Sequence, residues 1–220
     1  MSSKKCIACG LVNFAADETC RRCGASLDAV LTDEALGDER PRRKLWLRLL
    51  FTPALILFIL LVLYLSLLFT SNPIDSKQRE TVERAIAVLE SKGFTQEAFM
   101  LRHAVSFRAT DNWWNRWVGH ADAYAATNFP FEVVTLYPDF FNLPVDDVER
   151  AAVLLHETYH LYGRGEEAAF KGAWREKRRL GWTSRIYGES PVWKNVSEST
   201  GSVAPQFFQC GTDLHSDCYE

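Results

Sequence analysis

The 220-residue chain has no surplus of basic residues: 25 Lys and Arg stand against 28 Asp and Glu, and its net charge is −3 at pH 7. A slightly acidic chain offers no electrostatic reason to expect nucleic-acid binding, and we expect none. It also has no low-complexity tract and no internal repeat apart from one pair of cysteine motifs. Its six cysteines are confined to the two ends of the chain, with four near the N-terminus and two near the C-terminus. The length is enough for one proper domain and smaller modules.

One segment lacks charge altogether. Leu49–Phe69 holds 21 residues without an Asp, Glu, Lys or Arg, enough to cross a hydrocarbon core of about 30 Å as a helix. Trp46 and Tyr64 stand toward its two ends, as interfacial aromatic residues do. More than forty residues precede the segment, so it is not a cleavable signal peptide. The sequence predicts a single transmembrane helix over 45–70.

The basic residues are unevenly placed around this segment. The C-terminal flank has none until Lys77, whereas five crowd the N-terminal flank: Arg40, Arg42, Arg43, Lys44 and Arg48. By the positive-inside rule, the N-terminus lies in the cytosol. We therefore expect a single-pass membrane protein with a cytosolic N-terminus, a linker over 28–44 and an extracytoplasmic domain over 75–220.

The four N-terminal cysteines form two C-x-x-C-G motifs, with Cys6 and Cys9 in the first and Cys20 and Cys23 in the second. Each motif offers two thiolates to one tetrahedral zinc ion. So short a module cannot fold on hydrophobic burial alone, and a reducing cytosol disfavours disulfides. The sequence predicts one structural zinc in residues 1–27.

This spacing resembles small zinc ribbons. With Asn13 it is also similar to the Ran-binding-protein type of zinc finger, although Lys4 stands where that finger has Trp. The ribbon implies a cytosolic partner that the sequence does not identify.

The most informative motif is His156-Glu157-Thr158-Tyr159-His160, which reads H-E-x-x-H and continues to Gly163 and Glu166. Residues four apart share one face of a helix, so both imidazoles can reach one zinc ion. Glu157 then points at the open coordination position. The run before His156 is almost wholly apolar from Ala151, which suits a buried helix. This pattern predicts a catalytic zinc site.

A catalytic zinc takes three protein ligands and leaves a fourth position for water. Glu166 lies six residues after His160, the spacing of the third ligand in metzincin peptidases, and Gly163 stands where that family has a turn glycine. Metzincins also carry a methionine turn downstream, whereas this chain has no Met after Met100. Glu166 is similar too to the glutamate that starts the E-x-x-A helix of gluzincins. Glu167 is the alternative third ligand.

These thirty or so residues resemble zincin-like zinc metallopeptidases as a superfamily, without indicating one family. The resemblance implies an α+β fold: a mainly helical catalytic domain with a small sheet, in addition to the transmembrane helix and the zinc ribbon. It also implies that Phe131–Tyr137, the best predicted strand, is an edge strand that pairs with an extended substrate. We expect the motif helix to begin with Asp146 as N-cap and Glu149 in capping-box position.

Other segments give weaker predictions. Thr95–Phe107 is expected to be a helix, and the tail from Gly181 irregular. A packed aromatic layer is expected from Trp113, Trp114 and Trp117, and a solvated helical face from the basic residues of Ala168–Leu180. Cys210 and Cys218 can close a disulfide loop outside the cytosol. We expect no metal to be bound by the lone histidines His103, His120 and His215.

These residues predict a membrane-anchored zinc metallopeptidase that hydrolyses a peptide or protein substrate. His156, His160 and Glu166 hold the catalytic zinc, and Glu157 is the general base. Tyr187 or Arg185 is a candidate for stabilising the oxyanion. The alternative is a non-enzymatic membrane scaffold or signalling protein, with a cytosolic ribbon and an exported domain that binds a metal or another ligand.

Overall fold

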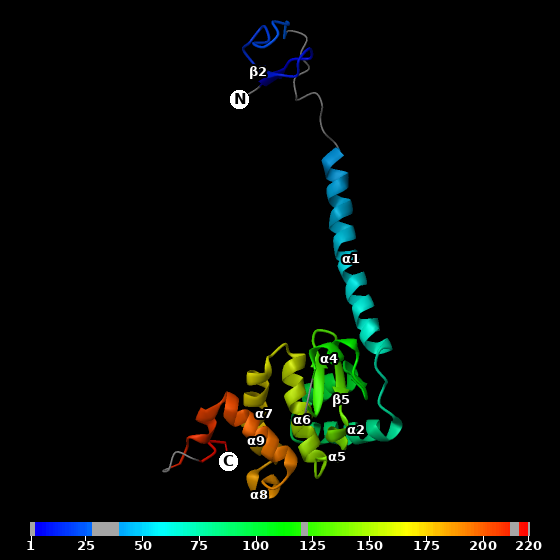
Figure 1. The fold of residues 1–220 in the computed structure, drawn as a ribbon, viewed down its shortest axis with the longest axis vertical. Helices are drawn as coiled ribbons and strands as arrows, with labels where there is room; N and C mark the ends of the chain where they lie inside the picture. Colours follow the sequence, from blue (N-terminus) through cyan, green and yellow to red (C-terminus); the bar gives the residue numbers. More distant parts are fainter. Residues whose placement is uncertain (1–2, 28–39, 120–122, 212–215, 220) are drawn as a thin grey trace. The chain divides into compact units, whose positions relative to one another are not determined.

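The computed structural model describes residues 3–27, 40–119, 123–211 and 216–219, which Figure 1 draws in colour. The chain forms two compact units, Met1–Ile59 and Leu60–Glu220, and the boundary between them falls inside one long helix. Most of the predicted linker (28–39), His120 and His215 lie outside the described residues.

The first unit contains a small hairpin and two cysteine turns. Strand β1 (Ser3–Lys5) pairs antiparallel with β2 (Val12–Phe14). The buried apolar cluster of this unit consists of Cys6, Cys20 and Leu27. Three buried side chains are too few to fold a module on hydrophobic burial, so a further source of stability is needed.

Helix α1 (Arg40–Phe69) begins five residues before the predicted span, inside the predicted linker. Its segment Leu49–Phe69 is long and apolar enough to cross a membrane. At 1.5 Å per residue, its 21 residues extend about 31 Å, close to the thickness of a hydrocarbon core. Every side chain over residues 49–62 is exposed.

The second unit is mixed α+β, which confirms the class predicted from the sequence (Figure 1). Its strands are β3 (Ser106–Arg108), β4 (Ala125–Asn128) and β5 (Val133–Leu136). Its helices after α1 are α2 (Ser76–Ser91), α3 (Thr95–His103), α4 (Trp113–Val118), α5 (Pro138–Asn142), α6 (Asp147–Leu161), α7 (Glu166–Leu180), α8 (Ser184–Tyr187), α9 (Pro191–Val203) and the 3-10 helix η1 (Pro205–Phe208).

The three strands form one sheet in the order β3-β5-β4, with β3 parallel and β4 antiparallel to β5. The prediction of an edge strand at Phe131–Tyr137 is therefore wrong, because β5 is central and all four of its residues are buried. A strand covered on both faces reads as a continuous apolar run, which is what made this segment conspicuous. The edge next to α6 is β4. The helix predicted over Thr95–Phe107 stops at His103, and Phe107 lies in β3.

Helix α6 is the centre of the second unit and packs against α2, α7 and β4. Asp146 caps it as predicted, accepting hydrogen bonds from the N–H groups of Val148 (2.9 Å) and Glu149 (3.1 Å). Glu149 does not complete the expected capping box; its carboxylate accepts from the Val145 N–H instead. Ala151, Leu154 and Leu155 are wholly buried. Leu154→Ala at such a site costs about 2–5 kcal/mol.

The C-terminal tail is helical rather than irregular as predicted, because α8, α9 and η1 occupy it. Cys210 and Cys218 form a disulfide. Lys177, expected on a solvated face, is fully buried and pairs with Asp217 at 3.1 Å. Its ammonium lies 5.2 Å from the ring centroids of Trp174 and Trp193, within reach of cation–π attraction. The tail is thus attached to α7 by an ion pair in the aromatic core.

Candidate metal centre and active site

His156 and His160 lie one turn apart on α6, and their Nε2 atoms are 3.1 Å apart. The Nδ1 of His160 lies 2.8 Å from the Arg164 carbonyl oxygen, which can only accept a hydrogen bond. Nδ1 therefore carries a proton, and Nε2 is the nitrogen available to a metal. Phe170 packs edge-on against His156, with ring centroids 4.5 Å apart. Each imidazole is thus oriented by a neighbour.

Glu166 is brought to the histidines by the turn between α6 and α7. Gly163 has a φ of 71°, and a Cβ there would lie 3.2 Å from the Phe129 ring, so this tight left-handed position suits glycine. At Gly172 a Cβ would lie 2.2 Å from Cζ of Tyr159, so only glycine lets α7 approach α6 this closely. The carboxylate of Glu166 then lies 3.3 Å from His156 Nε2 and 3.4 Å from His160 Nε2.

Glu167, the alternative ligand, has a different partner. Its carboxylate pairs with Lys171 one turn later on the exposed face of α7. The group that the structure brings together as a possible metal site is His156, His160 and Glu166, with all ligand atoms within 4.8 Å of one another.

The donor geometry fits zinc. Zn–N and Zn–O bonds of about 2.0–2.1 Å at tetrahedral angles place donor atoms about 3.3 Å apart. The observed separations are 3.1, 3.3 and 3.4 Å. Two imidazoles and one carboxylate also match the ligand set of catalytic zinc, which needs one more position for water.

Glu157 lies in the same cavity as the three donors and is 4% exposed. The Thr127 hydroxyl donates a hydrogen bond of 2.7 Å to Glu157 Oε2. Thr127 belongs to β4 and pairs with Val134 of central β5, so the sheet fixes the donor. The sheet edge thus holds the carboxylate that the sequence predicts to be the general base.

The cavity has a volume of about 220 Å³, room for part of a substrate rather than a whole ligand of drug size. Apolar side chains from α6, α7, α9, β4 and the loop after α7 form most of its wall: Ala126, Ala152, Val153, Phe170, Trp182 and Val196. Among its polar groups, Asn195 donates through Nδ2 to the Tyr124 hydroxyl oxygen at 2.7 Å. The phenolic proton of Tyr124 is then available to another acceptor. Burial raises the pKa of Tyr124, which keeps this donor protonated.

The three candidate ligands, His156, His160 and Glu166, form a charged cluster. Burial lowers the pKa of His160, but the hydrogen bond to Glu166 and the nearby Glu157 charge outweigh it and raise the pKa to about 9. Hydrogen bonds from His156 and His160 hold the pKa of Glu166 far below its usual range. A cation that enters this group at neutral pH must therefore displace a proton.

Tyr187 is wrong as a candidate oxyanion donor. Its hydroxyl donates to Asp146 Oδ2 at 2.8 Å, at the N-terminal end of α6. Ten residues of helix, about 15 Å, separate Asp146 from His156. Arg185 is exposed and is not among the cavity residues. Sequence reasoning did not assign Thr127, Tyr124 and Asn195 to the site; they enter it through packing of β4 against α6 and of α9 against α7.

Other predicted residues lie elsewhere. His103 is exposed and stacks on Phe99, with ring centroids 4.6 Å apart. The disulfide residues Cys210 and Cys218 are not among the residues that line the cavity.

The first unit brings Cys6, Cys9, Cys20 and Cys23 together, with all four sulfurs within 4.8 Å of one another. Cys6 and Cys23 sulfurs are 3.6 Å apart, and those of Cys9 and Cys20 are 3.5 Å apart. A tetrahedral site with Zn–S bonds of about 2.3 Å requires about 3.8 Å. This group can hold a metal ion and is compatible with zinc.

Asn13 joins the two cysteine turns. Its Nδ2 donates to the Leu11 carbonyl (3.0 Å) and toward Cys20 Sγ (3.7 Å), and its Oδ1 accepts from the Arg21 N–H (3.1 Å). Desolvation raises the pKa of Cys20, but hydrogen bonds from the Arg22 and Cys23 N–H groups prevail and lower it to about 6. A thiolate at neutral pH is the form that binds zinc.

Comparison with protein-family models, curated proteins and solved structures gives no match for this chain. Function is therefore inferred from the geometry of the two metal-ligand groups and their surroundings.

Proposed function

We propose that the second unit is a zinc-dependent metallopeptidase anchored to a membrane by α1. The observation that carries this proposal is the convergence of His156, His160 and Glu166 at tetrahedral donor spacing, in a cavity that also contains Glu157. A metal-binding scaffold needs the three donors only. The buried carboxylate beside them, held by Thr127, favours hydrolysis over the non-enzymatic alternative.

Zinc held by His156, His160 and Glu166 would supply a polarising charge for a scissile carbonyl and would lower the pKa of a bound water. Glu157 takes a proton from that water as the oxygen attacks the carbonyl carbon, and gives it to the amine nitrogen as the C–N bond breaks. Thr127 keeps the carboxylate in place during both transfers. Tyr124, oriented by Asn195, donates a hydrogen bond to the carbonyl oxygen as negative charge develops on it.

The first unit is proposed as a zinc ribbon with four cysteine ligands. The five basic residues before Leu49 support a cytosolic position for this unit and an extracytoplasmic position for the peptidase. Protease added to spheroplasts or intact cells should then digest a C-terminal tag and spare an N-terminal tag. The opposite pattern would reverse the topology without affecting the chemistry proposed for the site.

The catalytic proposal is tested by Glu157→Gln in the full chain, with Glu167→Gln in the first turn of α7 as the matched control. Activity is measured on a fluorogenic peptide library, and metal content by mass spectrometry. Glu157→Gln should retain zinc and lose hydrolysis, because a general base does not hold the ion. Glu167→Gln should retain both. If zinc-loaded wild type fails to cleave and to bind a peptide hydroxamate, a zinc-directed probe, the peptidase proposal is wrong.

A further inference from the structure

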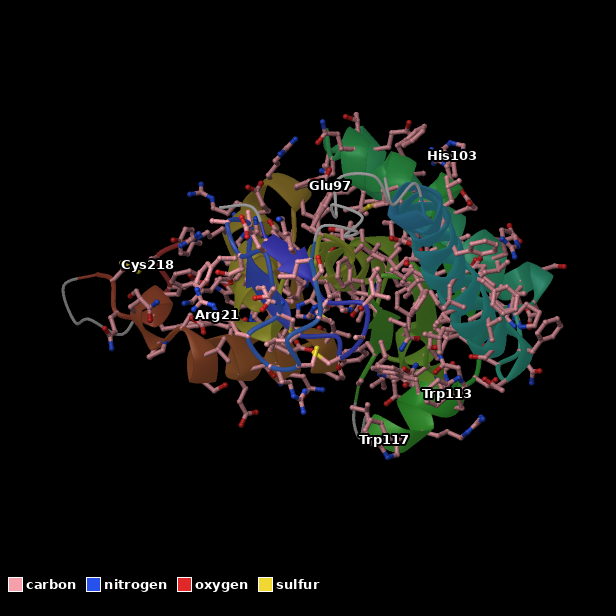
Figure 2. All side chains as sticks on the ribbon, turned by 90° about the horizontal axis from the view of Figure 1, so that it is seen from above. Arg21, Glu97, His103, Trp113, Trp117 and Cys218 are labelled. Atoms are coloured by element: carbon pink, nitrogen blue, oxygen red, sulfur yellow. A yellow bond between two sulfur atoms is a disulfide. The ribbon has the colours of Figure 1, made fainter. Side chains whose placement is uncertain are left out.

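Helix α4 presents an exposed apolar surface that the peptidase proposal does not use. Trp114, Trp117 and Val118 are 42%, 79% and 52% exposed, and we name them the α4 face. The sequence prediction of a packed tryptophan layer is wrong for these residues. Trp114 and Trp117 contact each other edge-on, with ring centroids 6.5 Å apart. Figure 2 labels Trp117 on α4, together with Trp113. Clustered exposed tryptophans indicate a binding surface.

The N-terminal end of α4 is bonded to the last turns of α1, which from Leu60 onward belong to the same unit. Trp113 Nε1 donates to Ser66 Oγ at 2.9 Å, and the Trp113 N–H donates to Thr70 Oγ1 at 3.2 Å. Arg116 Nη1 donates to the Thr70 carbonyl at 3.3 Å. Ser66 and Thr70 bracket Phe69, the last residue of the candidate span. The helix that carries the α4 face therefore starts at the level where the span ends.

Buried hydrogen bonds fix α4 to the sheet. The side chains of Asn112 and Asn115 each bond to Asn128 of β4 at 2.7 Å, and Asn115 Nδ2 donates to Thr135 Oγ1 of β5 at 3.0 Å. All four residues are buried. A buried polar network whose members are hydrogen-bonded to one another holds them in one arrangement. The α4 face is thus presented by a rigid part of the unit.

Two further contacts fix the end of α1 to this unit. Arg108 of β3 donates to the Leu68 and Ser71 carbonyls and to Ser71 Oγ, which satisfies acceptors at the C-terminal end of α1. Tyr64 OH and Ser106 Oγ of β3 share a hydrogen bond of 3.2 Å. The depth of α1 in a bilayer therefore sets the depth of α4.

We propose that the α4 face inserts into the interfacial layer of the phospholipid bilayer that α1 crosses. A span that ends at Phe69 places Ser66–Thr70 at the boundary between acyl chains and headgroups, where the tryptophan indole is favoured. Phe69 is 85% exposed at the same level and adds apolar surface. The peptidase unit is then held on the membrane at two points, in one orientation. This proposal depends on α1 crossing a membrane and is independent of the catalytic proposal.

The test uses the full chain in nanodiscs of phosphatidylcholine whose acyl chains carry bromine near the glycerol end. Trp46→Phe serves as the background, so that a tryptophan at the other end of α1 does not contribute. In that background, Trp117→Phe is compared with Trp193→Phe, a substitution of a tryptophan that is 7% exposed in the core. The share of tryptophan emission quenched by bromine is measured, and iodide in the buffer reports exposure to water.

Trp117→Phe should lower the bromine-quenched share by about one third, if Trp113, Trp114 and Trp117 contribute equally at the interface. The buried Trp193 is shielded from both bromine and iodide. Trp193→Phe should therefore lower only the unquenched emission. The proposal is overturned if Trp117→Phe leaves the bromine-quenched share unchanged or removes iodide-quenched emission. If the emission of Trp117 is shielded from both quenchers only in nanodiscs that hold two chains, the α4 face contacts a second copy of the chain. That result also overturns the proposal.

Discussion

Replacing Glu166 by Ala should remove zinc from the second unit while leaving the ribbon loaded. Glu166 approaches both Nε2 atoms, at 3.3 and 3.4 Å, and contributes the only negative charge among the three donors. Its side chain is 70% exposed, so truncation leaves no cavity and should not affect folding. The expected effect is therefore on metal affinity alone.

The size of this effect follows from the ligand count. Loss of a hydrogen-bonding group that only orients a metal ligand weakens metal binding by about 10- to 100-fold. Loss of a ligand itself should weaken it by at least about 100-fold, or about 2.7 kcal/mol at 25 °C. Glu167→Ala makes the same truncation on the same turn of α7, where the carboxylate pairs only with Lys171. It should leave affinity unchanged.

Zinc content of the purified full chain distinguishes these outcomes without a known substrate. After dialysis against a zinc buffer, wild type and Glu167→Ala should hold two zinc ions per chain, and Glu166→Ala should hold one. Two ions in Glu166→Ala and one in Glu167→Ala would refute the assignment of the third ligand. Two ions in both variants would mean that the third ligand is another residue, and one ion in wild type would remove the catalytic site altogether.

Four further predictions concern neighbouring groups. Thr127→Val should lower kcat/KM by about 10- to 100-fold with zinc retained, because it removes a hydrogen bond to the charged Glu157. Thr127→Ser keeps the hydroxyl and should retain activity. An unchanged rate in Thr127→Val contradicts the positioning role. Tyr124→Phe should lower kcat by about 10²- to 10³-fold with KM and zinc unchanged, as for loss of an oxyanion donor; a change confined to KM contradicts this. Cys20→Ser should reduce the zinc content from two ions to one per chain and expose residues 3–27 to limited proteolysis, with peptide hydrolysis by the second unit unchanged. A first unit that resists protease in this variant refutes the argument that metal binding folds it. Zinc affinity of the second unit should fall about tenfold per pH unit below pH 9, because the raised pKa of His160 means that zinc must displace a proton. Zinc titrations at pH 6.5, 7.5 and 8.5 measure this slope. An affinity that does not change with pH contradicts the prediction.

The sequence was sufficient for features that depend on local spacing. His156 and His160 share a face because four residues make about one helical turn, and the cysteine motifs converge because each is a short turn. Asp146 caps α6 through its own side chain, as its chemistry dictates. The spacing after His160 predicts Glu166 as the third ligand and leaves Glu167 as the alternative, because the choice depends on how a turn directs the next helix.

Features that depend on long-range packing were missed or misassigned. Strand β4 has the sequence Ala-Ala-Thr-Asn, too weak a β pattern to be recognised, and it becomes a strand by pairing with β5. Helix α9 is rich in Ser and contains Gly201, yet its apolar Val192 and Trp193 anchor it in the core. The donors Thr127 and Asn195 come from these two elements, so the polar part of the site could not be predicted.

The contacts of Tyr187 show how α6 is held. Tyr187 bonds to Asp146, and the buried Glu149 accepts hydrogen bonds from the Val145 N–H, Trp182 Nε1 and Ser190 Oγ. A buried carboxylate is tolerated only when it is fully hydrogen-bonded, and its partners here come from the segments on both sides of α6. These bonds fix the first turn of α6, while Thr127 and α7 fix its last turns. A helix held at both ends presents His156, Glu157 and His160 in one arrangement, which is the preorganisation that metal binding and proton transfer both require.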